Sequence, residues 1–261
     1  MIFSYLVCSC PATAIRTAPA HQAEMSSQLL FGERAIALRQ EGDWLYIECE
    51  WDQYEGWVHS GGVTTVSLKQ YKKPAKSIVG TAGGKLLRPS AQTQIAPGAD
   101  LFGMKHRRFY WLEHDDICYK GARKVIKSLQ LSEQGITEAA MSYLGAPYLW
   151  GGRTHMGIDC SGLVQMVFKL HNMVMPRDAA MQAGKGEEVA FLQEAKAGDL
   201  AFFDNEEGQI VHVGILLDSQ RIIHASQQSG GVVIDAIDAG GIISRRLKRR
   251  TASLRIVKRY F

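Results

Sequence analysis

Residues 157–162 read Gly-Ile-Asp-Cys-Ser-Gly, and Leu-Val-Gln-Met-Val-Phe follows directly over residues 163–168. The apolar residues of the second run have helical spacing, so the sequence predicts that a loop becomes a helix at Cys160. The first turn of a helix presents unpaired backbone N–H groups and the positive end of the helix dipole. Such surroundings lower a thiol pKa from about 8.5 to roughly 3.5–7.5 and favour a thiolate nucleophile. A small buried residue that starts a core helix is the alternative interpretation.

Two histidines interrupt apolar strands downstream of this cysteine, His212 within residues 209–215 and His224 within residues 221–226. A cysteine nucleophile needs a base, and the base needs a polar group that orients it. If residues 218–220 form a hairpin loop, both imidazoles project from the same face of adjacent strands. We therefore predict that His212 is the base and that His224 orients it. One cysteine and two histidines are also a possible zinc site with water as the fourth ligand.

The sequence before residue 132 differs in composition and residue pattern from the region that contains Cys160. Residues 44–51 are rich in aromatic and β-branched residues and lie between turn-forming stretches, which predicts short strands of a small all-β barrel. Residues 69–76 have the composition of a linker, and short strand candidates recur between residues 77 and 121. A helical pattern over residues 134–144 then begins the last region. We predict three domains with the boundaries 1–68, 77–130 and 132–261.

The motifs of the last region together resemble the NlpC-type cysteine peptidases, which have a papain-like fold and cleave bacterial cell-wall peptides. Besides residues 157–162, the resemblance is carried by His-Val-Gly-Ile at 212–215, Ile-His-Ala-Ser at 223–226, Pro-Tyr-Leu-Trp-Gly-Gly at 147–152 and Gly-Asp-Leu-Ala-Phe-Phe at 198–203. It implies that Cys160 is the nucleophile, His212 the general base and His224 the third catalytic residue. It also implies that Tyr148 helps to stabilise the oxyanion.

The N-terminal half resembles bacterial SH3-like domains of a dipeptidyl-peptidase-VI-like subgroup. The matching stretches are Leu-Leu-Phe-Gly-Glu at 29–33, Gly-Asp-Trp-Leu at 42–45 and Tyr-Glu-Gly-Trp-Val at 54–58, and Met-Pro-Arg-Asp-Ala at 175–179 fits the same subgroup. The resemblance implies hydrolysis of the γ-D-glutamyl–diaminopimelate bond in peptides with a free N-terminal L-alanine. Asp159 would then bind the ammonium group of the substrate. The substrate pocket implied by the resemblance also contains Ser161, Glu33, Tyr54, Arg177 and Asp178.

Composition and charge limit the classes of partner and the cellular location that the sequence favours. The chain has 261 residues, of which 46% are hydrophobic and 21% charged, and its net charge of +4 does not indicate a nucleic-acid partner. The basic run 245–250 is interpreted as a solvated turn, with a patch for an anionic surface as the alternative. No apolar run reaches the roughly 18 residues of a membrane span. Five irregularly spaced cysteines predict no disulfide framework, which favours the cytoplasm.

These observations predict an α+β protein in which two small SH3-like barrels precede a papain-like domain. The expected reaction proceeds through a thioester on Cys160, requires neither a cofactor nor a metal, and has a bell-shaped pH profile. The expected partner is a peptide derived from the cell wall, in murein peptide recycling. Two alternatives stay open: an acyltransferase that uses the same thioester, and a wall-peptide-binding module without catalytic activity.

Overall fold

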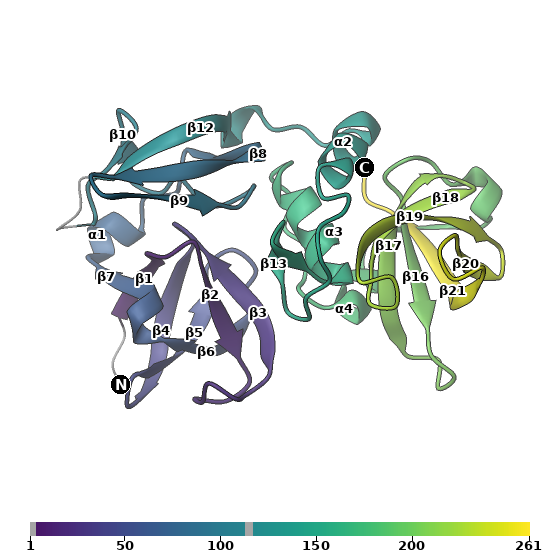
Figure 1. Cartoon of the computed structure of the whole chain (residues 1–261), viewed down its shortest axis with the longest axis horizontal. Coiled ribbons are helices and arrows are strands. Elements are labelled where there is room, and N and C mark those ends of the chain that lie inside the picture. Colours follow the sequence, from purple (N-terminus) through teal and green to yellow (C-terminus); the bar gives the residue numbers. More distant parts are fainter. Residues whose placement is uncertain (1–3, 113–116) are drawn as a thin grey trace. The chain divides into compact units, whose positions relative to one another are not determined.

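The computed structural model describes residues 4–112 and 117–261 and divides the chain into two compact units, Met1–Leu129 and Gln130–Phe261 (Figure 1). The first unit consists mainly of strands, and the second combines helices with an antiparallel sheet. The α+β class is therefore confirmed. Among the described residues, no helix has both the length and the apolar character that a membrane span requires.

The N-terminal unit begins with an antiparallel sheet whose strands follow one another in the order β3-β2-β6-β5-β4-β1-β7. Its apolar side chains, among them Leu6, Ile15 and Ile47, form a common core, as expected for a small barrel. The strands are β1 (Ser4–Cys8), β2 (Ala12–Arg16), β3 (Met25–Leu30), β4 (Arg34–Glu41), β5 (Trp44–Cys49), β6 (Glu55–His59) and β7 (Val63–Val66), with the 3-10 turn η1 (Ser60–Gly62) before β7.

A second sheet of the N-terminal unit has the order β10-β11-β12-β8-β9. It contains β8 (Ser77–Arg88), β9 (Ala91–Ile95), β10 (Met104–Lys105), β11 (Arg108–Phe109) and β12 (Cys118–Val125), followed by η2 (Ile126–Ser128). The predicted linker before it contains a short helix, α1 (Leu68–Tyr71). This helix forms because Ser67 and Gln70 make a reciprocal capping box. The composition of residues 69–76 alone did not predict a helix there.

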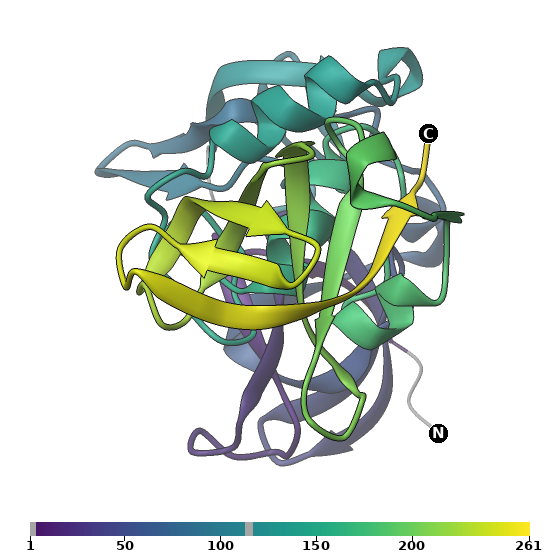
Figure 2. The same cartoon turned by 90° about the vertical axis from the view of Figure 1, so that its right-hand side faces the viewer.

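The C-terminal unit is built on a sheet with the order β15-β21-β16-β17-β18-β19-β20, and an additional pairing of β20 with β21 closes it (Figure 2). The strands are β15 (Glu187–Val189), β16 (Leu200–Asp204), β17 (Ile210–Asp218), β18 (Arg221–Ser226), β19 (Gly231–Asp238), β20 (Gly241–Ser244) and β21 (Arg249–Arg259). Phe203, Leu216 and Ile237 belong to the core cluster that these strands enclose.

Three helices lie together on one side of this sheet (Figure 1). They are α2 (Glu133–Met141), α3 (Cys160–Lys169) and α4 (Ala179–Ala183), and the short elements β13 (Arg153–Thr154), β14 (Gly157–Ile158) and η3 (Leu192–Glu194) complete the unit. Every residue of α3 is buried, because the helix packs against β17 and β18 on one side and against α2 and α4 on others. The start of α3 is thereby held firmly against the sheet.

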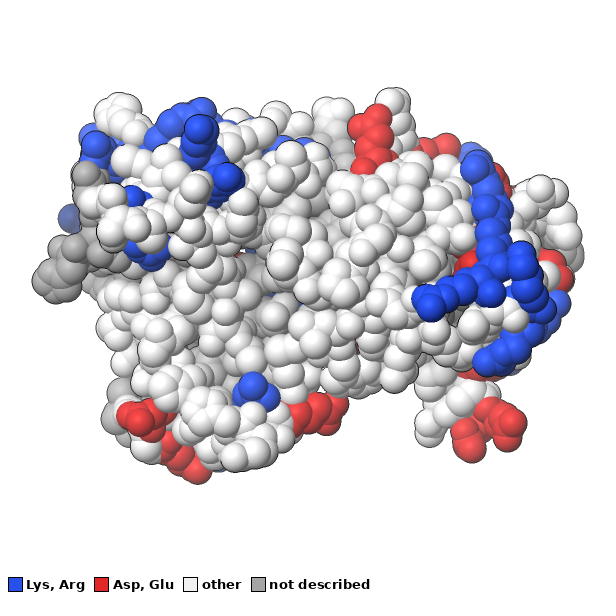
Figure 3. Space-filling model, viewed as in Figure 1, with Lys and Arg blue, Asp and Glu red and all other residues white. Residues whose placement is uncertain are grey.

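The basic run 245–250 lies at the exposed turn between β20 and β21, and lysine and arginine side chains gather over this unit in Figure 3. Several of these side chains have local partners: Arg250 forms a bidentate pair with Asp238, and Arg246 donates to the carbonyl of Ser229. These contacts are those of a solvated turn.

Candidate active site

Cys160 is the first residue of α3, as the sequence predicts, and only 7% of its surface is exposed. The helix begins here because Asp159 is its N-cap, with a carboxylate oxygen that accepts the N–H of Gly162 at 2.7 Å. The sulfur accepts hydrogen bonds from the backbone N–H groups of Ser161 and Val213. Since Val213 is in β17, the sulfur lies against the strand that also carries His212.

The expected lowering of the thiol pKa is wrong. Burial raises the pKa of Cys160 to about 11, and the neighbouring carboxylate of Asp159 adds to the increase. The two backbone N–H groups and Arg177 act in the opposite direction but are outweighed. The sulfur therefore carries its proton in the resting site, and a nearby base must remove it.

The two histidines meet as the sequence predicts. His212 Nε2 lies 2.8 Å from His224 Nδ1, and the two rings are inclined at 78°. The hairpin loop is shorter than expected, since Asp218 pairs with Arg221, but a bulge between Leu216 and Asp218 restores the predicted pairing of Ile215 with Ile223. The parity of the strands is therefore unchanged, and both imidazoles lie on one face of the sheet.

Burial and the neighbouring His224 lower the pKa of His212 to about 3. This imidazole is therefore neutral at physiological pH and has one nitrogen with a free lone pair. Its Nε2 is engaged by His224, which leaves Nδ1 as the nitrogen that can receive the thiol proton. The arrangement can perform general-base catalysis on a neutral thiol.

A fourth polar residue, Asp235, contacts His224 and was not predicted from the sequence. His224 Nε2 lies 3.2 Å from a carboxylate oxygen of Asp235 in β19, and the other oxygen accepts the backbone N–H of Arg245 at 2.8 Å. Only 2% of each of the two side chains, His224 and Asp235, is exposed. The sequence did contain a signal for Asp235: an acidic residue interrupts the mainly apolar run 231–238, just as His212 and His224 interrupt apolar strands.

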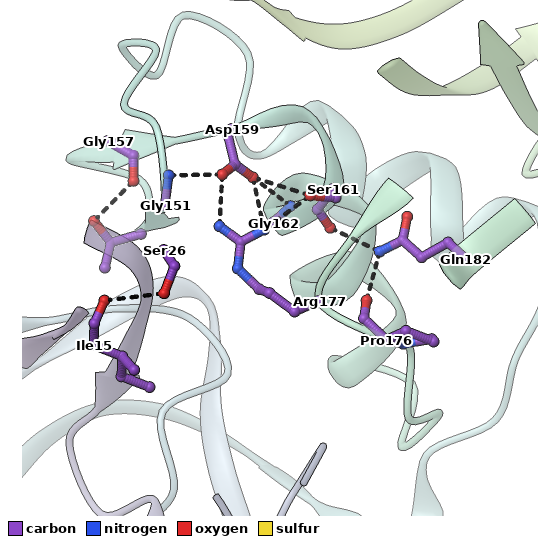
Figure 4. Close-up of polar contacts among 11 residues, drawn as sticks. Ile15, Ser26, Gly151, Gly157, Asp159, Ser161, Gly162, Pro176, Arg177 and Gln182 are labelled. Carbon is purple, nitrogen blue, oxygen red and sulfur yellow. Dashed lines mark hydrogen bonds and ion pairs between the residues drawn. The ribbon is translucent and has the colours of Figure 1, made fainter. Parts of the chain in front are cut away.

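The predicted substrate-binding residues Asp159, Ser161 and Arg177 form a buried cluster beneath the start of α3 (Figure 4). The Arg177 guanidinium makes two hydrogen bonds to the Asp159 carboxylate, at 3.0 and 2.5 Å, and a third to Ser161 Oγ at 2.8 Å. Asp159 also accepts the N–H of Gly151 at 2.8 Å. Both carboxylate oxygens thus have partners within the chain, and the predicted role of Asp159 in binding the substrate ammonium stays a prediction.

Tyr148 lies close to the nucleophile. Its N–H donates to the carbonyl of Gly230 at 3.0 Å, so the start of β19 holds the tyrosine in place. Burial raises the pKa of Tyr148, and negative charge on Cys160 and on Asp159 raises it further, which reflects their proximity. The phenol is therefore protonated and can donate a hydrogen bond near the sulfur.

The other predicted pocket residues have separate positions. Asp178 is exposed and immediately follows the buried Arg177, at the N-cap of α4. Glu33 is buried in the N-terminal unit, where its carboxylate accepts the N–H of Leu30 at 2.8 Å. Tyr54 packs against the core of the same barrel. The predicted role of Glu33 and Tyr54 in a substrate pocket stays a prediction.

The zinc alternative does not fit the histidines. Both nitrogens of His224 are engaged, one by His212 and the other by Asp235, so His224 has no free lone pair to converge on a metal with that of His212. Within residues 4–112 and 117–261, no group of three or more histidine, cysteine, aspartate or glutamate side chains is arranged to hold a metal ion.

Comparison with known proteins adds two family models. The model described as "NlpC/P60 family" matches residues 145–251, and "Bacterial dipeptidyl-peptidase Sh3 domain" matches residues 15–63. The first match contains Cys160, His212, His224 and Asp235, and the second lies within the first predicted domain. The resemblance inferred from the motifs is confirmed.

Individual relatives agree with these matches. The chain is 27% identical to "Gamma-D-glutamyl-L-lysine dipeptidyl-peptidase" of Bacillus subtilis, over 80% of this chain and 75% of that protein. It is 35% identical to a "Probable endopeptidase" of Haemophilus influenzae, over 48% of this chain and 78% of the relative. A crystal structure of an NlpC/P60 family protein from Bacillus cereus superposes with a TM-score of 0.82 at 18% identity, covering 98% of this chain and 99% of that one. This structural similarity shows that the fold is shared along the whole chain.

Proposed function

The chain belongs to the NlpC/P60 family, and on that premise we propose that it hydrolyses the bond between γ-D-glutamate and a diamino acid in free cell-wall peptides. The observations that carry the proposal are the Cys160 sulfur bonded to the backbone N–H of Val213, next to His212 on β17, and the hydrogen bond between His212 and His224. The SH3 match and the name of the Bacillus subtilis relative support this specificity over that of an enzyme acting on intact wall.

In the proposed reaction, the Cys160 sulfur attacks the γ-glutamyl carbonyl carbon while its proton passes to His212 Nδ1. The Tyr148 phenol and a backbone N–H near Cys160 stabilise the oxyanion of the tetrahedral intermediate. The C–N bond then breaks, and the amine of the diamino acid takes the proton from His212. Water activated by the neutral His212 hydrolyses the remaining thioester and releases L-Ala-γ-D-Glu.

The requirement for a free N-terminus calls for a carboxylate in the substrate pocket. Asp159 is the predicted residue, and its carboxylate is buried and paired with Arg177. Asp178 is exposed and adjacent in sequence to that buried arginine, on an element that packs against α3 and β17. We propose that Asp159, with Asp178 in the same pocket, pairs with the L-alanine ammonium group, which an acylated peptide lacks.

A role in murein peptide recycling in the cytoplasm follows from this specificity. Free tripeptides are fragments of degraded wall, and an enzyme that rejects blocked N-termini is suited to them. No disulfide joins any two of the described cysteines, Cys8, Cys10, Cys49, Cys118 and Cys160, which is consistent with a reducing compartment.

The proposal is tested by mass spectrometry of the products from L-Ala-γ-D-Glu-diaminopimelate and from its N-acetylated form. We expect wild type to release L-Ala-γ-D-Glu from the free peptide only, and Cys160→Ala to release none. Cys118→Ala is the matched control, since this thiol lies in the N-terminal unit, and it should retain full activity. Equal cleavage of both peptides would refute the free-amine specificity. Acyl transfer to an added amine in place of hydrolysis would indicate the acyltransferase, and no turnover would indicate the binding module.

A further inference from the structure

Asp235 is a buried carboxylate at the end of the hydrogen-bonded series His212–His224–Asp235. It lies in β19 opposite Ile222 of β18, so its side chain shares a face with His224. One oxygen is held by the backbone N–H of Arg245, and the other faces His224 Nε2. Burial acts to raise the pKa of Asp235, but the hydrogen bonds from His224 and from Arg245 leave it below its usual value. The carboxylate is therefore ionised.

An ionised carboxylate accepts hydrogen bonds and cannot donate one. His224 Nε2 must consequently carry a hydrogen, and in the neutral ring Nδ1 is then a lone pair. With that tautomer of His224, the bond of 2.8 Å between the imidazoles requires His212 Nε2 to donate. The neutral His212 ring has a single N–H, so its Nδ1 is left bare and can accept the proton of Cys160.

We propose that Asp235 is a positioning residue that fixes the catalytic tautomer of His212 through His224. The proposal rests on the proposed function, because it assigns Asp235 a part in the same reaction. When the Cys160 proton reaches His212 Nδ1, the Nε2–H bond to His224 keeps its direction, and so does the bond from His224 to Asp235. No proton needs to reach the carboxylate, which contributes its negative charge and its acceptor geometry.

Asp235→Asn tests this inference with little change in shape. The amide oxygen can keep the bond to Arg245, while the amide N–H₂ faces His224 Nε2 and forces that nitrogen to accept. The direction of every bond in the series then reverses, and His212 Nδ1 carries a hydrogen where a lone pair is needed. We expect kcat to fall on the order of 10²–10⁴-fold, the upper figure being the loss that a wrong histidine tautomer causes in a serine peptidase, with KM changed by less than about twofold.

Asp238→Asn is the matched control, because Asp238 lies on the same strand but is paired with the exposed Arg250. Its kcat should equal that of wild type. The second measurement is ¹⁵N NMR of the histidine rings, in which the His212 signals are assigned by their loss in His212→Ala. In wild type we expect a bare Nδ1 and a protonated Nε2 on His212, and the reverse in Asp235→Asn.

Two results would overturn the inference: an unchanged kcat in Asp235→Asn, or a wild-type spectrum with a hydrogen on His212 Nδ1. If Asp235→Asn does not fold, the wild-type spectrum alone decides. The spectrum requires no substrate, so it also decides if the wild-type enzyme fails to cleave the proposed peptide. That failure would refute the proposed function and leave the tautomer result to stand on its own.

Discussion

At Cys160 the effects of position and of burial act on the thiol in opposite directions. The helix start supplies backbone N–H groups, yet removal from water raises the pKa to about 11, while burial and His224 lower that of His212 to about 3. The resting pair is therefore a neutral thiol and a neutral imidazole. Attack on the substrate and transfer of the proton to His212 are then expected to occur together.

This state predicts how Cys160 reacts with iodoacetamide. Because the thiol pKa is about 11, the thiolate fraction grows with pH below that value, and the alkylation rate should rise about tenfold for each pH unit from 6 to 9. The rate is measured by mass spectrometry of the peptide that contains Cys160. A rate independent of pH over this range would instead indicate a thiolate–imidazolium pair. The sequence predicts a bell-shaped pH profile of kcat/KM. We therefore expect the falling edges of that profile that belong to the enzyme to lie below pH 5 and above pH 9.

Tyr148→Phe tests the oxyanion donor. Loss of the phenol hydroxyl removes one hydrogen bond that forms in the transition state, so we expect kcat to fall by about 10²-fold with KM nearly unchanged. Tyr143→Phe is the matched control, because its buried hydroxyl has no hydrogen-bond partner within the described part of the chain. Equal kcat values for the two variants would remove Tyr148 from the mechanism.

At the scale of elements, the start of α3 depends on a long-range ion pair. Asp159 caps the helix and is held in two hydrogen bonds by Arg177, and both side chains are nearly inaccessible to water. The pair fixes the backbone on either side of Cys160. Its partners are 18 positions apart in sequence, with Arg177 in a loop that has no periodicity, so local patterns cannot reveal it.

Arg177→Met should therefore destabilise the C-terminal unit. It leaves the Asp159 carboxylate buried without its cation, which costs about 3–5 kcal/mol of the free energy of unfolding. Urea unfolding followed by circular dichroism measures the loss. Arg221→Met is the control, because its pair with Asp218 is exposed and is worth about 0–1 kcal/mol. A similar loss in both variants would contradict the structural role of the buried pair.

The β17–β18 hairpin shows which features of the candidate site could be predicted from the sequence. The alternation of apolar residues predicted that His212 and His224 share a face, and this held although the loop is shorter and a bulge compensates. Parity survives such changes because the side-chain period of a strand is two. Asp235 escaped prediction because its contact with His224 depends on the register of β19 against β18, and the Gly-rich stretch at residues 227–231 marks a turn without fixing that register.

At the scale of the whole molecule, the chain forms two compact units with separate cores. A strand-rich composition gives way to helical spacing near residue 132, close to the boundary between the units after Leu129, and the three domains expected from the sequence stay a prediction. Thiol pKa values follow from tertiary burial instead, and the sequence around Cys160 could not reveal how completely α3 is enclosed.

The second unit contains what independent folding requires, so we expect the piece Gln130–Phe261 to fold alone. Its sheet is closed by the pairing of β20 with β21, and α3 is buried within the same unit. The isolated piece should unfold cooperatively in urea and show near-ultraviolet circular dichroism, which a loosely packed state lacks. Glu33→Gln in the full chain provides the companion measurement.

The two experiments together locate the free-amine specificity. If the carboxylates of the C-terminal unit, Asp159 and Asp178, suffice, the isolated piece will cleave the free peptide in preference to the N-acetylated one, and Glu33→Gln will keep the ratio of kcat/KM values. If Glu33 takes part as the resemblance implies, both changes will lower that ratio, by about 10-fold or more for loss of a charge-assisted hydrogen bond. We expect the first result, because the carboxylate of Glu33 is buried and already accepts the N–H of Leu30. A lowered ratio in Glu33→Gln would contradict this and return the residue to the pocket.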